Sequence, residues 1–109
     1  MAFDPVLAER MREHLGPLRE IKMFGGLCFT HRGHMVCGLL NGDGLILRLS
    51  HDSVEHLIAQ GRARAFEPMK GRPAKGMVVI DDAAELDDEP LAGWLGQAMA
   101  FVETLPPKP

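Results

Sequence analysis

The chain is poor in the residues and motifs on which most enzymatic signatures depend. It contains no tyrosine, one tryptophan and two cysteines among 109 residues. It also lacks the Gly-x-Ser-x-Gly, His-Glu-x-x-His, Gly-x-x-x-x-Gly-Lys-Ser/Thr and Gly-x-Gly-x-x-Gly motifs of hydrolases, metalloproteases and nucleotide-binding proteins. The sequence therefore predicts no enzymatic activity, no catalytic residues and no cofactor.

Long apolar runs are absent as well. No stretch approaches the roughly 18 consecutive apolar residues that span a bilayer. The first residues, MAFDPVLAERM, mix acids and bases and lack the pattern of a signal peptide. We therefore expect a cytoplasmic protein with reduced thiols. The net charge of −3 argues against a strong duplex-binding surface.

The composition that is present is that of a soluble globular protein. The chain is 46% apolar and 25% charged, and its length suits one domain with a single core. We expect this stand-alone domain to cover residues 1–105, followed by a frayed tail at 106–109.

Three helices are predicted from capping residues and apolar periodicity. Asp4-Pro5 can start the first helix, and Gly16-Pro17 can end it. Ser50 or Asp52 can cap a second helix that closes near Gly61. A long amphipathic helix should begin at 87–88 and run to about residue 105, with an apolar stripe that includes Leu91, Trp94, Leu95, Ala98 and Val102.

Strands are predicted between these helices. Three apolar stretches, Ile21–Thr30, His34–Leu40 and Leu45–Ser50, are separated by glycine-containing turns and indicate a three-stranded antiparallel meander. Two further strands are expected at Ala63–Pro68 and Gly76–Asp81. The order α-β-β-β-α-β-β-α predicts an α+β fold with an antiparallel sheet packed by helices.

The stretch CFTHRGHMVC, residues 28–37, has the densest set of possible metal ligands. A two-residue turn at Arg32-Gly33 would set His31 opposite His34 and Cys28 opposite Cys37. The histidines and cysteines would then lie on different faces of the sheet, so the four could not bind one zinc ion. Cys28 and Cys37 would form a close pair on one face, and we retain them as a candidate thiol pair, although packing is the simpler interpretation.

A basic cluster follows the second predicted helix. Five of the twelve lysines and arginines fall within residues 62–75: Arg62, Arg64, Lys70, Arg72 and Lys75. Such a cluster could contact phosphates or an acidic partner. Only Phe66 could stack on a base there, so a solvated loop remains the simpler alternative.

The run from Lys22 to Ser50 resembles the N-terminal domain of the TfoX/Sxy regulators of bacterial natural competence. The residues that carry the resemblance are Met23-Phe24-Gly25-Gly26, Gly33 in the hairpin turn and Leu47-Arg48, followed by the strand at Met77–Ile80 and the helix with Trp94. The resemblance implies an α+β domain with a regulatory or protein-interaction role. The full-length regulators of that family carry a second, helical domain and act with the cyclic-AMP receptor protein at competence promoters.

The glycine pair within that motif has two interpretations. Gly25 and Gly26 could let a partner or ligand approach the backbone beside Lys22 and Phe24, or they could simply let a strand bend. We treat Lys22, Phe24, Gly25 and Gly26, together with the basic cluster, as candidate interaction residues.

Three hypotheses on function follow from the sequence. The first is a small non-catalytic protein-interaction module that binds a protein partner or a second copy of itself, because both faces of the first hairpin carry apolar residues: Leu27, Phe29, Val36 and Leu40 on one, and Cys28, Met35, Cys37 and Leu39 on the other. The second is a nucleic-acid accessory factor with weak contacts through residues 62–75. The third is a redox or metal protein centred on the Cys28/Cys37 hairpin.

Overall fold

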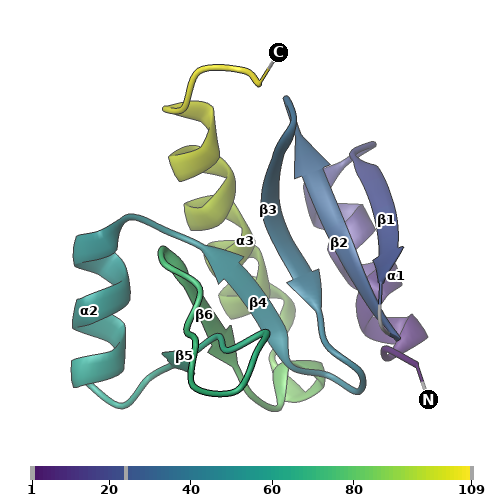
Figure 1. Ribbon diagram of the computed structural model, residues 1–109. Helices are drawn as coiled ribbons and strands as arrows, with labels where there is room; N and C mark the ends of the chain where they lie inside the picture. Colours follow the sequence, from purple (N-terminus) through teal and green to yellow (C-terminus); the bar gives the residue numbers. More distant parts are fainter. Residues whose placement is uncertain (1, 24, 109) are drawn as a thin grey trace.

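A computed structural model describes residues 2–23 and 25–108 of the chain, and Figure 1 shows it as a ribbon. Within these residues the protein has three α-helices, one short 3₁₀ helix and one six-stranded antiparallel sheet. The predicted α+β class and order of elements are confirmed. The elements are α1 (Pro5–Leu15), β1 (Arg19–Met23), β2 (Gly26–His31), β3 (His34–Leu39), β4 (Leu45–Arg48), α2 (His51–Ala59), β5 (Arg64–Ala65), β6 (Met77–Ile80), η1 (Ala83–Glu85) and α3 (Asp88–Glu103).

The predicted meander contains one more strand than expected. The sheet order is β1-β2-β3-β4-β6-β5, so the first four strands are consecutive neighbours. The stretch Ile21–Thr30, predicted as one strand, is divided because Met23 pairs with Gly26 and the chain reverses between them. Gly25 has φ of +78°, the left-handed region that such a tight turn requires.

The helix boundaries follow the local signals. The Asp4 side chain accepts hydrogen bonds from the backbone N–H of Val6 and Leu7, at 2.9 and 3.1 Å, and Gly16 ends α1 with φ of +76°. Ser50 caps α2 by accepting from Ser53 N–H at 3.2 Å. These interactions satisfy backbone donors that have no partner within a helix.

One face of the sheet packs against α1 and α3 and holds the core. α3 contacts β3, β4 and α1, and both helices lie behind the sheet in Figure 1. The buried residues of this layer come from all of these elements and include Leu7, Met11, Leu27, Phe29, Val36, Cys37, Leu39, Leu45, Leu47, Leu91, Leu95 and Val102. We call this side of the sheet the helix face.

The other side, which we call the open face, is covered over only part of its width. The helix α2 contacts β5 and β6 at one end of the sheet, but its Leu57 belongs to the core of the helix face, so the cover on the open face comes from the loop that follows β5. Ile46 and Val79 pair across β4 and β6 and are buried there outside the main core. The predicted strand Ala63–Pro68 is a true strand only at Arg64–Ala65, and the chain then continues as a loop. No helix of the described residues covers β1, β2 and β3 on this side (Figure 1).

The carboxyl-terminal residues contact the turn between β2 and β3. Lys108 N–H donates to Arg32 O at 3.0 Å, and His34 Nε2 donates to Pro106 O at 2.7 Å. Arg32 and Gly33 both have positive φ, as the predicted two-residue turn requires. A Cβ at Gly33 would lie 2.7 Å from Lys108 Cβ, so residues 106–108, which we expected to fray, approach the glycine itself.

Backbone packing in the sheet makes a stability prediction for Gly26. A Cβ there would clash with the backbone oxygen of Leu39, which cannot move without disturbing β3. We expect Gly26→Ala to lower the free energy of unfolding by about 1–3 kcal/mol, the usual cost of overpacking. Chemical denaturation followed by the fluorescence of Trp94 would measure it.

Gly93→Ala is the matched control. Gly93 is exposed in the interior of α3, and a Cβ there meets nothing within 4 Å. Alanine should therefore stabilise the protein by about 0.5–1 kcal/mol. Equal effects of the two substitutions would contradict the close approach at Gly26.

Candidate functional site

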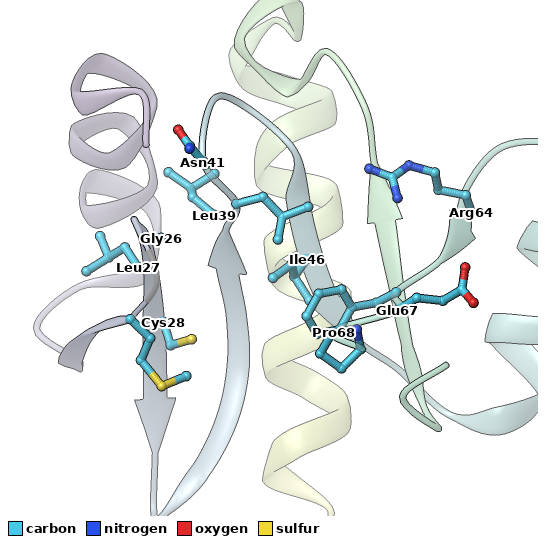
Figure 2. Close-up of a pocket in the computed structure, with 12 residues that line it drawn as sticks. Gly26, Leu27, Cys28, Leu39, Asn41, Ile46, Arg64, Glu67 and Pro68 are labelled. Carbon is cyan, nitrogen blue, oxygen red and sulfur yellow. The ribbon is translucent and has the colours of Figure 1, made fainter. Parts of the chain in front are cut away.

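The open face carries a hollow between the strands and the segment that follows β5. Its volume is about 290 Å³, and its apolar lining comes from β1–β4 and from Phe66 and Pro68. In Figure 2, Ile46 and Pro68 lie in the middle, with Gly26, Leu27 and Cys28 to one side and Arg64 and Glu67 to the other. Segments that are far apart in sequence therefore build one concave surface.

Two glycines keep side chains away from the part of the open face beside the hollow. Gly26 follows the first hairpin turn, and Gly38 pairs with Cys28. A Cβ at Gly38 would lie 2.7 Å from Leu27 O, much as one at Gly26 would meet Leu39 O. The backbone that approaches Gly26 most closely is therefore the chain's own β3. The close approach of β3 supports a role of the Gly25-Gly26 pair in the chain's own fold. Contact between these glycines and a partner stays a prediction.

A β-bulge changes the predicted register of the hairpin. His31 pairs with His34 and Thr30 with Met35 as expected, but Phe29 pairs with Cys37, which leaves Val36 as the extra residue. Both Val36 and Cys37 are fully buried in the core on the helix face. The Leu39 side chain is buried in the same core, whereas Leu40 is outside that core and both residues contribute to the lining of the hollow. The predicted division of apolar residues between the two faces is therefore wrong beyond the bulge.

The two cysteines are not opposite each other. Cys28 pairs with Gly38 and lines the hollow, whereas Cys37 points into the core beside Phe29. Both thiols are free. The predicted opposition on one face is wrong because the bulge shifts β3 by one residue relative to β2. A disulfide needs the two Cβ atoms to point toward each other, and side chains on opposite faces do not.

Burial raises the pKa of both thiols. Partial burial raises the pKa of Cys28 above its ordinary value of 9.0. Burial also raises the pKa of Cys37 strongly, with a smaller contribution from nearby Cys28. Both thiols are therefore protonated at neutral pH, the opposite of the activated thiolate that a redox centre uses.

The histidines lie at the turn end of the same hairpin. His34 is 8% exposed and donates to the Pro106 carbonyl, so Nε2 carries a proton, while Nδ1 has no hydrogen-bond partner among the described residues. Within residues 2–23 and 25–108, no three His, Cys, Asp or Glu side chains lie together as a metal site would require.

The basic cluster is divided by its contacts. Arg64 binds Asp81 through two hydrogen bonds of 2.8 and 3.0 Å, and this contact lowers the pKa of the Asp81 carboxyl. The Arg62 guanidinium lies 5.2 Å from the centre of the Trp94 ring. Lys70, Arg72 and Lys75 are exposed on the loop between β5 and β6.

The remaining predicted interaction residues belong to the first hairpin. Lys22 is exposed on β1, Gly25 is in the turn, and Phe24 lies outside the described residues. Sequence reasoning missed Met23, Leu40, Ile46, Phe66 and Pro68 as lining residues of the hollow. The alternation around Ile46 could have assigned it to the second face of β4, but nothing local indicates that Phe66 lies near it.

A comparison with protein families gives one match. The model of the TfoX N-terminal domain family matches residues 9–102, which include every strand, more than half of α1 and nearly all of α3. No curated protein and no solved structure matches the chain. No helix in the described part of the chain combines the length and the apolar character needed to cross a membrane.

The different settings of the cysteines predict their reactivity. We expect one thiol, Cys28, to react with iodoacetamide in the folded protein. Because its pKa is raised, the pH at which its rate reaches half of the maximum should lie above 9.0, the midpoint of an ordinary thiol. Mass spectrometry after timed alkylation would identify the modified residue.

Cys28→Ser should abolish this reaction and Cys37→Ala should leave it unchanged. Alkylation of Cys37 in the folded protein, or a Cys28–Cys37 disulfide formed under mild oxidation, would show that the two side chains do not lie on opposite faces.

Proposed function

Because the chain belongs to the TfoX N-terminal domain family, we propose that it is a small, non-catalytic regulatory module that acts by binding a partner protein on the open face. The family is a regulatory one. The observation that carries the proposal is the apolar hollow beside the two glycines of β2 and β3. The free thiols suit a module that works in the cytoplasm, which is a reducing compartment.

The size of the hollow favours a protein partner over a small ligand. Pockets for drug-sized ligands usually measure about 300–1,000 Å³ and bury most of the ligand. A hollow of about 290 Å³ that opens onto a sheet surface is at the lower limit of this range. It suits one or two bulky apolar side chains that project from a larger molecule.

The surroundings of the hollow fit an extended protein segment. Met23 and Gly26 also line a second, more open hollow of about 500 Å³ near the start of α1. The apolar surface therefore continues around the first hairpin turn. Asn41 and Glu67 supply polar groups at its border, while Arg64 is held by Asp81. An apolar centre with a polar rim is the usual anatomy of a protein interface.

The other hypotheses have less support. A nucleic-acid accessory factor would rely on three exposed cations, Lys70, Arg72 and Lys75, because Arg62 and Arg64 already contact Trp94 and Asp81. A redox or metal centre would need the ligands of the hairpin on one side of the sheet. A role in competence or transcription is compatible with a protein-binding module and would depend on the identity of its partner.

Met23→Glu tests the proposed surface. Met23 is 47% exposed, so a charge there should leave the fold intact, but it would place a carboxylate at the border of both hollows. In affinity purification from native cells, we expect wild-type protein to retain a specific partner. Met23→Glu should retain about tenfold less of this partner, because binding would bury an unpaired charge.

Val6→Glu is the control, since Val6 is 69% exposed on α1 and lines neither hollow. It should retain the partner as wild type does. A partner that binds wild type and Met23→Glu equally, or that Val6→Glu loses, would contradict the assignment of the open face.

A further inference from the structure

The edge strand β1 is exposed along its whole length. All five of its residues, Arg19–Met23, are exposed, including Ile21 at 39% and Met23 at 47%. Its pairing with β2 is regular from Arg19 to Met23, without a bulge, and it contains no proline. Bulges and prolines are two devices with which natural sheets protect an edge, because free backbone groups pair readily with another strand, and β1 has only its charged side chains for this purpose.

The opposite edge of the same sheet is protected. β5 is only two residues long, α2 lies against it, and the chain after it runs into Pro68. A further strand could therefore add to this sheet at β1 but not at β5.

The residues of β1 are complementary to themselves in one antiparallel register. In the order Arg19, Glu20, Ile21, Lys22, Met23, a two-fold axis through Ile21 places each acid opposite a base. We propose that β1 pairs antiparallel with β1 of a second copy of this chain, with Glu20 opposite Lys22 of the partner subunit and the reverse. The two-fold symmetry gives two identical contacts, each between an acidic and a basic side chain. Opposite charges that face each other across two strands stabilise the pairing.

The contacts already made by Glu20 are compatible with this pairing. Arg12 of α1 donates to both carboxylate oxygens of Glu20 at 2.8 Å, which holds the pKa of Glu20 below its ordinary value. Each oxygen has two lone pairs, so the carboxylate can also accept from an ammonium group. Glu20 and Lys22 are two residues apart, so their side chains share one face and their backbone groups the same edge.

The same register would also cover exposed apolar side chains on the open face. Ile21 pairs with Cys28 within the chain and would lie opposite Ile21 of the partner subunit. Pairing would cover apolar side chains that are now exposed, and it would join the two open faces into one continuous surface. This inference goes beyond the proposed function, since the hollow can accept a partner protein whether or not β1 is paired.

A charge exchange between two variants tests the register. In Lys22→Glu, Glu20 would face a glutamate twice, and in Glu20→Lys, Lys22 would face a lysine twice. We expect each variant alone to dimerise about tenfold more weakly than wild type, because like charges directly opposite each other are destabilising. An equal mixture of the two variants restores both opposite-charge contacts, so a heterodimer should form with nearly wild-type affinity. Sedimentation equilibrium, with one variant labelled, would measure all three.

A wild-type chain that stays monomeric at its highest soluble concentration would overturn the proposal, as would a mixture that dimerises no better than either variant. Thermal unfolding of each variant would identify a loss of dimer that is due only to a damaged fold, since Glu20→Lys also removes the contact with Arg12. A variant with a damaged fold would dimerise no better in the mixture than alone, and that result would count against the register.

Met23→Glu separates this inference from the proposed function. In the proposed register it places a carboxylate opposite Arg19 of the partner subunit, so the dimer should persist while capture of a partner protein is lost. Persistence of the dimer supports the register, and dissociation contradicts it, whatever happens to capture.

Discussion

The close approach of β2 and β3 at their two glycines is the constraint on which the structure depends. Neither Gly26 nor Gly38 can carry a Cβ without meeting a backbone oxygen of the neighbouring strand. A backbone atom cannot move aside as the end of a flexible side chain can, so these two positions determine how closely β2 and β3 approach each other. The same positions leave the open face without side chains beside Cys28, which creates room for the hollow. One packing requirement therefore accounts for both the fold and its concave surface.

The two sides of the sheet consequently have different roles. The helix face buries apolar residues of β2, β3 and β4 under α1 and α3 and supplies most of the core. On the open face Ile46 and Val79 are buried, whereas apolar side chains of β1 such as Ile21 and Met23 remain accessible. A small domain that leaves such a surface uncovered is expected to use it for binding.

The sequence predicted the features that local chemistry determines. Asp4, Gly16 and Ser50 act through contacts within a few residues, so the ends of the helices could be read directly. The bulge at Val36 could not, because the run from Met35 to Leu40 is apolar throughout and alternation cannot fix a register there. The first meander strand is shorter than predicted because the Gly25-Gly26 pair is compatible with a bend within one strand as well as with a turn, and Gly25 has a positive φ in a turn. The hollow escaped prediction since its lining residues meet only in the folded chain.

Amide hydrogen exchange of the protein, alone and bound to its purified partner, tests the assignment of the open face most directly. The account predicts that binding slows exchange at β1 and at residues 26–28 and 38–41, while the outer sides of α1 and α3 exchange as before. Protection confined to α1 and α3, or to the basic loop at residues 69–75, would contradict it.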